Sequence, residues 1–263
     1  MPAAKTVNVK LYKGEIEITF NPESQWARYK VNGQPTTGVT SVTGMKDKSG
    51  PLMYWAVNCM RDYLLGKFYQ GQPITEADIL AASKEHQVKK TQAAGIGTRV
   101  HEWIEQWTIL KGNFSTMPEG SDDDTRKVLN GIIAFLKWID DNKVKIIESE
   151  RIVYSREFDF VGTLDAVAKI NGKLCMLDYK TSKVFSTEHR YQTAAYQQAY
   201  YEEFGVNFDA RYILKLGKED GEFTTAYLPH EEFAGDIGAF LGLLALKKRE
   251  GQIKNWESVL NMR

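Results

Sequence analysis

The chain has 263 residues, 43% of them hydrophobic and 26% charged, which is typical of an ordinary globular protein. Its 34 basic and 34 acidic residues cancel, which excludes a uniformly basic nucleic-acid coat but still allows a local basic channel. Cys59 and Cys175 are the only cysteines, so neither a disulfide framework nor a four-cysteine zinc or iron–sulfur site can form.

The N-terminal residues lack both a signal-peptide core and an arginine-rich presequence, and no apolar run reaches transmembrane length. We therefore expect a reduced, cytoplasmic environment and no membrane partner. Residues 7–32 then alternate between apolar and polar side chains, with turn signals at Lys13-Gly14 and Asn21-Pro22. This alternation predicts an N-terminal β-hairpin or meander.

Residues 38–50 form a polar segment that is predicted to be a loop or a short helix. Its hydroxyl and ammonium groups are candidates for contacts with a phosphate backbone, although a solvated loop explains them equally well: Ser41, Thr43, Lys46 and Lys48. Pro51 suits the first turn of the following helix. The apolar stripe of this helix is expected to lie in the core: Leu52, Trp55, Ala56, Cys59 and Tyr63.

Thr75 and Asp78 have the spacing of a capping box, which predicts a helix over residues 76–90. A second helix is expected to be interrupted or kinked near Gly95-Ile96-Gly97, and it carries His101 and Glu105 on one face. A single helical histidine is usually a packing or surface group, but a neutral imidazole also binds metals, so His101 is a candidate ligand.

The acidic run from Asp122 to Asp124 suits the first turn of a helix over residues 125–142. A strand is predicted over residues 145–154, with Glu148 and Glu150 along it.

The strongest local signal is Asn171-Gly172, a two-residue hairpin turn between the aliphatic runs 160–170 and 173–180. With this turn, Asp165 lies directly opposite Asp178, with the two Cβ atoms roughly 5 Å apart. Side chains alternate along a strand, so Lys180 shares the face of Asp178. The opposite face is expected to be apolar, with Leu164, Ala166 and Ala168 on the first strand.

Two carboxylates in such a position repel each other, and a divalent cation would neutralise them. Lys180 would then point at a water or phosphate beside the ion. The alternative is a solvated hairpin face with a simple Asp–Lys pair. Apolar neighbours on both faces disfavour it, because an unpaired carboxylate is costly to bury.

After the hairpin, residues 182–190 are predicted to be a polar loop with Lys183 and Arg190, followed by a helix over 191–204 that places Gln192 and Tyr196 on one face. A hairpin (210–216 and 223–228) and a helix over 231–249 complete the chain. The basic end of this helix, Lys247-Lys248-Arg249, is expected to be a solvated terminus.

Four motifs occur in order: G-x-x-x-H-E-x-x-E around His101, G-T-L-D at 162–165, L-D-Y-K at 177–180 and Q-x-x-x-Y at 192–196. Together with S-V-T at 41–43 and D-x-K-T-S at 178–182, they resemble the RecB-like exonuclease branch of the PD-(D/E)XK nuclease superfamily, including its mitochondrial genome-maintenance exonucleases and related phage and bacterial nucleases.

The resemblance implies a role for each matching residue. His101, Asp165, Asp178 and the carbonyl of Tyr179 would bind Mg²⁺ or Mn²⁺, and Glu150 would match an acidic position for a second metal or its water. Lys180 would position the attacking water, and Gln192 and Tyr196 would support the lysine and the nucleic-acid strand. No iron–sulfur cluster is expected. The phosphate contacts of residues 41–48 would be joined by Lys183 and Arg190.

The resemblance also implies an α/β (α+β) fold with a restriction-endonuclease-like core, in which helices flank a mixed central sheet. A single nuclease domain over 1–263 would comprise a β extension (1–37), a helical lobe with the metal-ligand histidine (38–142), the catalytic sheet and motif helix (143–230), and a C-terminal helix and tail (231–263). The expected activity is metal-dependent exonuclease cleavage of DNA, preferably single-stranded or with free ends, in replication, recombination, repair or phage DNA metabolism.

Two alternatives remain open at this point: a structure-specific endonuclease of the same superfamily, and a non-catalytic nucleic-acid-binding module with a nuclease core. The presence of every catalytic position disfavours the second. A zinc hydrolase is disfavoured because the four histidines (86, 101, 189 and 230) contain no H-x-x-x-H pair.

Overall fold

The alternating N-terminal segment forms a four-stranded antiparallel sheet in the computed structural model, which describes residues 6–24, 27–112 and 116–253. Its strands are β1 (Val7–Leu11), β2 (Ile16–Phe20), β3 (Tyr29–Val31) and β4 (Gln34–Pro35). The predicted turn at Lys13-Gly14 is confirmed, with positive φ at both residues. Asn32-Gly33 makes a second tight turn, between β3 and β4, which the sequence analysis did not separate.

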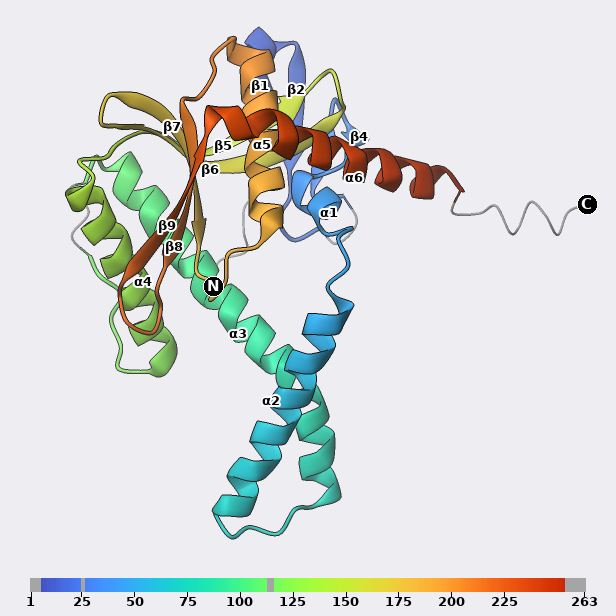
Figure 1. Cartoon of the computed structure of the whole chain (residues 1–263), viewed down its shortest axis with the longest axis vertical. Helices are drawn as coiled ribbons and strands as arrows, with labels where there is room; N and C mark the ends of the chain where they lie inside the picture. Colours follow the sequence, from blue (N-terminus) through green and yellow to red (C-terminus); the bar gives the residue numbers. More distant parts are fainter. Residues whose placement is uncertain (1–5, 25–26, 113–115, 254–263) are drawn as a thin grey trace, which may run out of the picture.

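A five-stranded mixed sheet lies at the centre of the molecule, in the order β5-β6-β7-β8-β9 (Figure 1). The strands are β5 (Lys145–Ser155), β6 (Phe160–Ile170), β7 (Lys173–Lys180), β8 (Ala210–Leu216) and β9 (Phe223–Pro229). Neighbouring strands are antiparallel except for β7 and β8, which are parallel and are connected through α5 (Thr187–Phe204).

Helices cover both faces of this sheet, which explains why its middle strands are almost entirely apolar. The C-terminal half of α3 (Glu76–Ile109) and α4 (Asp123–Asp141) pack on one face, where Trp103, Phe135 and Trp138 contact Ala166, Leu177 and Leu214. Helices α5 and α6 (Phe233–Ile253) cover the other face around Met176 and Phe240. This arrangement confirms the predicted α/β fold with a mixed, helix-flanked central sheet.

The predicted interruption near Gly95 is wrong, because α3 is one continuous helix. Each glycine costs about 1 kcal/mol relative to alanine in a helix interior, but Ile96, Val100 and Trp103 are buried directly after this point and hold the helix on the sheet. At Gly97 a Cβ atom would lie 3.0 Å from Thr181 Oγ1, so the missing side chain lets α3 approach the end of β7.

Helix α2 (Ser49–Tyr69) and the first half of α3 project away from both sheets as a helical hairpin, which we call the arm (residues 49–92; Figure 1). The predicted capping box of Thr75 and Asp78 is present where α3 begins. The expectation that the apolar stripe of α2 lies in the core is wrong for most of it. Cys59 is buried, but Leu52 and Trp55 remain 54% and 37% exposed because, within the described part of the chain, α3 is the one element with extensive contacts to this helix.

The remaining helices differ from their predicted bounds by short lengths. Residues 39–43 form the short helix α1 (Val39–Thr43), and α5 begins at Thr187, inside the segment expected to be a loop. Helix α6 extends past its basic residues to Ile253, into the region predicted to be a tail (250–263), and residues 254–263 lie outside the described residues. Within the described ranges, none of the helices is both long and apolar enough to cross a membrane.

Candidate active site

The hairpin of β6 and β7 has the register expected from its turn. Asn171 and Gly172 both adopt positive φ, and the paired positions run from Ile170–Lys173 to Ala166–Leu177. The right-handed twist of two strands favours such a turn. The local signal therefore sets the alignment of the two acidic strands.

The regular ladder stops at Asp165, and this departs from the prediction of strictly alternating strands. Pairing with β7 ends at Ala166, and pairing with β5 passes from Ala166 to Leu164 without Asp165. Asp165 Oδ2 instead accepts a hydrogen bond of 2.6 Å from the Tyr179 N–H. Leu164 consequently packs with Val167 in the cluster under α5, not with Ala166 as expected.

Glu150 of β5 stands beside the same interruption. Its φ of 49° lies in the left-handed region, which is uncommon for a residue other than glycine and is typical of strained functional segments. Its side chain enters the space next to Asp165. Sequence reasoning gave Glu150 only an uncertain second-metal role, because the spacing of β5 does not reveal this backbone distortion.

Helix α3 brings His101 to these two carboxylates. His101 Nδ1 lies 3.7 Å from Glu150 Oε1 and 3.9 Å from Asp165 Oδ1, and one potential ligand atom from each residue lies within 4.8 Å of the others. The other ring nitrogen, Nε2, lies 3.2 Å from the Tyr179 carbonyl oxygen, and the Tyr179 ring contacts the imidazole edge. These contacts fix the ring so that Nδ1 faces the carboxylates.

Asp178 and Lys180 form an ion pair next to this group. Lys180 Nζ lies 2.8 Å from Asp178 Oδ1, to which it donates a hydrogen bond, and 2.7 Å from Oδ2. Asp178 is 1% exposed, and both of its carboxylate oxygens lie within ion-pair distance of the Lys180 ammonium. This ion pair offsets part of the cost of burying the Asp178 charge.

The pKa values reflect crowded, buried charge. Burial raises the pKa of Asp165, although His101 and Lys180 oppose this effect, and burial likewise raises the pKa of Asp178 against the influence of Lys180. Burial disfavours the Lys180 ammonium, but Asp178 and Asp165 prevail and raise its pKa. Burial also favours neutral His101, yet Asp165 and Glu150 together raise its pKa to about 9.

The donor set fits a divalent cation. A cation bound at His101 would compete with the imidazole proton, because the neutral ring is the metal ligand. Glu150 and Asp165 offer the carboxylate oxygens that Mg²⁺ and Mn²⁺ prefer, and His101 adds a nitrogen.

Helix α5 supports the site from the other side of β6. Gln192 Nε2 donates a 2.9 Å hydrogen bond to the hydroxyl of Tyr196, which is buried. A Cβ atom on Gly162 would lie 2.5 Å from Tyr196 Cε1, so only glycine leaves room for this ring against β6. The Q-x-x-x-Y motif and the G-T-L-D motif therefore contact each other directly.

A cavity of about 240 Å³ opens over the site between the small sheet, α1 and α5. Its lining includes Glu150, Asp165, Gln192 and Tyr196, together with Arg28 and Tyr29 of the N-terminal sheet. Sequence reasoning did not identify Arg28 or Tyr29. Their proximity depends on how the N-terminal sheet packs on β5 and β6, and no local motif reports that packing.

The six residues predicted to contact nucleic acid lie in different environments. Ser41 is exposed, whereas Thr43 is buried and donates to the Thr40 carbonyl. Lys46 is bonded to Thr187, and Lys48 pairs with Glu188, so both lysines hold the segment after α1 against the start of α5.

Arg190 is engaged away from the metal-ligand group. It pairs with Asp236 at 2.9 Å and with Glu232 at 2.6 Å, and both partners belong to the chain around the start of α6. Lys183 follows β7 and lines a larger cavity between the arm, the start of α4 and the turn that follows β8. Of the six predicted residues, Ser41 and Lys183 therefore have accessible positions in cavities.

Comparison with known protein families identifies the superfamily of the chain. Residues 57–258 match the family model of the PD-(D/E)XK nuclease superfamily, and the chain belongs to that superfamily. No curated protein sequence matches it.

The solved structures with similar chains include the following two. One is an alkaline exonuclease (LHK-Exo) from Laribacter hongkongensis, with 10% identity over 84% of this chain and 94% of that chain and a TM-score of 0.34. The other is SSO0001, with 16% identity over 70% and 71% of the two chains and a TM-score of 0.29.

Proposed function

We propose that the chain is a divalent-metal-dependent DNA exonuclease that acts on single-stranded DNA or DNA ends. The observation that carries this proposal is the convergence of His101, Glu150 and Asp165 beside the Asp178–Lys180 pair. Five polar groups from three strands and one helix meet at an interruption of the sheet, where each is costly to bury alone. Membership of the nuclease superfamily makes phosphodiester hydrolysis the chemistry that this arrangement serves.

His101, Glu150 and Asp165 would hold the ion, Mg²⁺ or Mn²⁺. Asp178 and the Tyr179 carbonyl are proposed as further ligands, which requires Asp178 to be shared with Lys180 and the carbonyl to release His101 Nε2. When bound, such an ion activates a water molecule and offsets the charge that develops on the phosphate during in-line attack. The protein supplies the fixed positions of its ligands. The hydrogen bond from Tyr179 N–H to Asp165 and the contact of Tyr179 with His101 limit the movement of two of them.

Lys180 is the proposed catalytic cation. Its pKa is raised, so the ammonium stays charged at neutral pH and can donate to the attacking water and to a phosphate oxygen. Asp178 fixes its position through the ion pair. Gln192 and Tyr196 are proposed to support β6 and the DNA strand above it, because the two hydrogen-bonded side chains line the cavity over Asp165.

DNA is the proposed partner, and replication, recombination or repair are the processes such an activity would serve. Ser41 and Lys183 support a nucleic-acid path on either side of the site because both are accessible. Each of three further candidates already has a partner within the protein: Lys46, Lys48 and Arg190. We propose that they hold the segments beside this path in position and do not bind DNA directly. Thr43 is buried, so its contribution would be structural.

The deciding experiment compares linear with closed circular single-stranded DNA in Mg²⁺. We expect linear strands to be degraded to short products and circles to survive, with EDTA abolishing the reaction and Mn²⁺ restoring it. Cleavage of circles would instead indicate an endonuclease of the same superfamily. DNA binding without cleavage of either form would indicate a non-catalytic binding module.

A further inference from the structure

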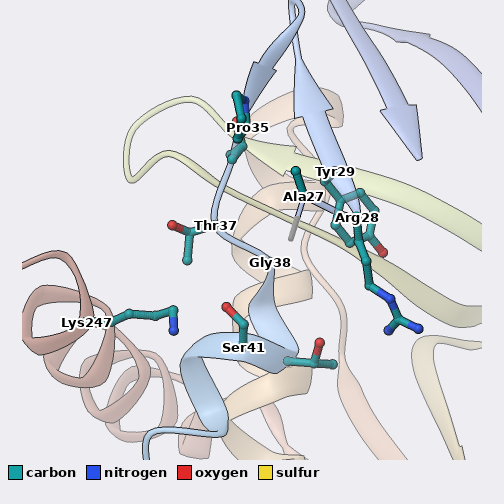
Figure 2. Close-up of a pocket in the computed structure, with 10 residues that line it drawn as sticks. Ala27, Arg28, Tyr29, Pro35, Thr37, Gly38, Ser41 and Lys247 are labelled. Atoms are coloured by element: carbon teal, nitrogen blue, oxygen red, sulfur yellow. The ribbon is translucent and has the colours of Figure 1, made fainter. Parts of the chain in front are cut away.

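A second cavity of about 430 Å³ lies beside the candidate active site, between the small sheet, α1 and α6 (Figure 2). Its volume is within the range of about 300–1,000 Å³ that is typical of small-ligand pockets. Ten residues line it: Ala27, Arg28, Tyr29, Pro35, Thr36, Thr37, Gly38, Thr40, Ser41 and Lys247.

This side cavity adjoins the cavity over the metal-ligand group. Arg28, Tyr29 and Thr40 line both spaces. The Tyr29 hydroxyl is hydrogen-bonded to Thr163 Oγ1 at 2.9 Å, and Thr163 stands two positions before Asp165 on β6. A nucleic-acid strand with one phosphate at the candidate active site can therefore place the neighbouring nucleotide in the side cavity.

The two ends of the side cavity differ in chemistry. Ala27, Tyr29 and Pro35 form an apolar end on the small sheet, and the Tyr29 ring is supported from behind by stacking on Phe20 at 4.7 Å. At the other end, Lys247 extends from α6 toward Ser41, with Thr37 nearby (Figure 2). This end offers an ammonium and hydroxyl groups.

Lys247 has no interaction that would account for its position. Among the described residues, its ammonium takes part in neither a hydrogen bond nor an ion pair, whereas its neighbour Lys248 donates to the Phe158 carbonyl at 2.8 Å. An ammonium group that is half-buried and unpaired beside hydroxyl donors suits a phosphate group. An aromatic ring and a proline at the other end suit the face of a base.

We propose that the side cavity binds one unpaired nucleotide of the substrate strand next to the scissile phosphate, with its phosphate at Lys247 and Ser41 and its base against Tyr29 and Pro35. This inference rests on the proposed function and deepens it. On this proposal the cavity, of about 430 Å³, takes a single nucleotide, and the site prefers DNA that is unpaired at this position. The basic residue of α6 then acts in substrate binding and is more than a solvated helix terminus.

The test measures binding of a fluorescently labelled single-stranded oligonucleotide in Ca²⁺ without Mg²⁺, and single-turnover cleavage in Mg²⁺. Lys247→Ala should weaken binding about tenfold and reduce the slope of log Kd against log salt by about 0.7, the value for one phosphate contact on a single strand. The cleavage rate at saturating DNA should stay within twofold of wild type. Arg249→Ala removes the same charge from an exposed position on the same helix and should change none of these values.

A scan with single methylphosphonate linkages locates the contact. At one position, loss of the phosphate charge should weaken wild-type binding about tenfold and leave Lys247→Ala unaffected, because the two changes remove the same interaction. Duplex DNA of the same length should bind both proteins equally. The proposal is overturned if Lys247→Ala binds single strands as tightly as Arg249→Ala does. It is also overturned if the affinity losses from Lys247→Ala and from the methylphosphonate multiply at every position of the linkage, or if Lys247→Ala weakens duplex binding as much as single-strand binding.

These outcomes separate the side cavity from the proposed function. Absence of both binding and cleavage in the wild-type protein contradicts the nuclease proposal. If the wild type binds and cleaves single strands and the Lys247→Ala variant has the same DNA affinity, only the proposal for the side cavity is contradicted.

Discussion

In the central sheet, most residues of β6 and β7 are buried between helices on both faces, whereas along the arm only Cys59 and Ala82 are buried. Several large apolar side chains of the arm face solvent, including Met53, Phe68 and Tyr69 at 68%, 64% and 78% exposure. Both regions contain many large apolar side chains, but only the central sheet has helices packed on both sides.

The difference determines what holds each region together. The sheet is stabilised by apolar burial, at about 25 cal/mol per Å² removed from water, and this tolerates the cost of buried charge at one point. The arm depends on local helix signals and on a few contacts between α2 and α3, such as the Trp55–His86 ring contact and the Lys67–Asp78 ion pair at 3.0 Å. We therefore expect substitutions in the sheet to affect chemistry and global stability, and substitutions in the arm to affect local opening.

The largest contrast should appear when one carboxylate is neutralised in each region. Asp178→Asn removes a charge beside Lys180 and the ion while keeping the side-chain volume, and we expect the single-turnover cleavage rate to fall about a thousandfold, equivalent to about 4 kcal/mol. Folding should be little changed, because burial already disfavours the charged Asp178 and the neighbouring carboxylates still balance Lys180. Thermal unfolding checks this second expectation.

Asp62→Asn is the matched control, since Asp62 lies on α2 and pairs only with the adjacent Arg61 among the described residues. Its cleavage rate should equal that of wild type. Cleavage by Asp178→Asn within tenfold of wild type would remove Asp178 from the site.

Adding a methyl group at two glycines should produce changes of opposite sign. Gly162→Ala places a Cβ atom 2.5 Å from Tyr196 Cε1 and 3.2 Å from Val39 Cγ2, so we expect a loss of about 1–3 kcal/mol in the free energy of unfolding and a displaced Tyr196. Gly66→Ala in α2 meets no atom within 4 Å and should stabilise this helix by up to about 1 kcal/mol. Urea unfolding measures the first effect, and amide hydrogen exchange of α2 measures the second.

The same comparison explains which features the sequence predicted. The turn at Asn171-Gly172 and the capping box of Thr75 are set by neighbouring residues, so short patterns identified both. The turn alone sets the alignment of the two strands, and this alignment brings Asp165, Asp178 and Lys180 into one region.

Features that depend on packing were missed. The helical stripe of α2 has the pattern of a core helix, but periodicity does not reveal that α3 is the one element among the described residues with extensive contacts to it. Gly95 and Gly97 suggested a break that the buried C-terminal half of α3 prevents. The interruption at Asp165 and the positive φ of Glu150 arise from three strands and a histidine meeting at one point, which no single segment encodes.

The smallest expected effect concerns acid, which should act on the two regions in opposite directions. Hydrogen bonds from the Thr75 hydroxyl and backbone, together with Lys67, lower the pKa of Asp78 from 3.8 to about 2. A lowered pKa means that ionised Asp78 stabilises the start of α3 above pH 3.8, and that this support is lost as the pH falls through about 2. Hydrogen exchange in the first turn of α3 should therefore show a difference between wild type and Asp78→Asn at pH 4 that disappears near pH 2. Burial raises the pKa values of Asp165 and Asp178, so their protonation removes buried charge from the sheet over a higher pH range and begins before the arm loosens. Loss of protection in β6 and β7 before the start of α3 would reverse this order and contradict the assignment of buried carboxylates with raised pKa values to the sheet.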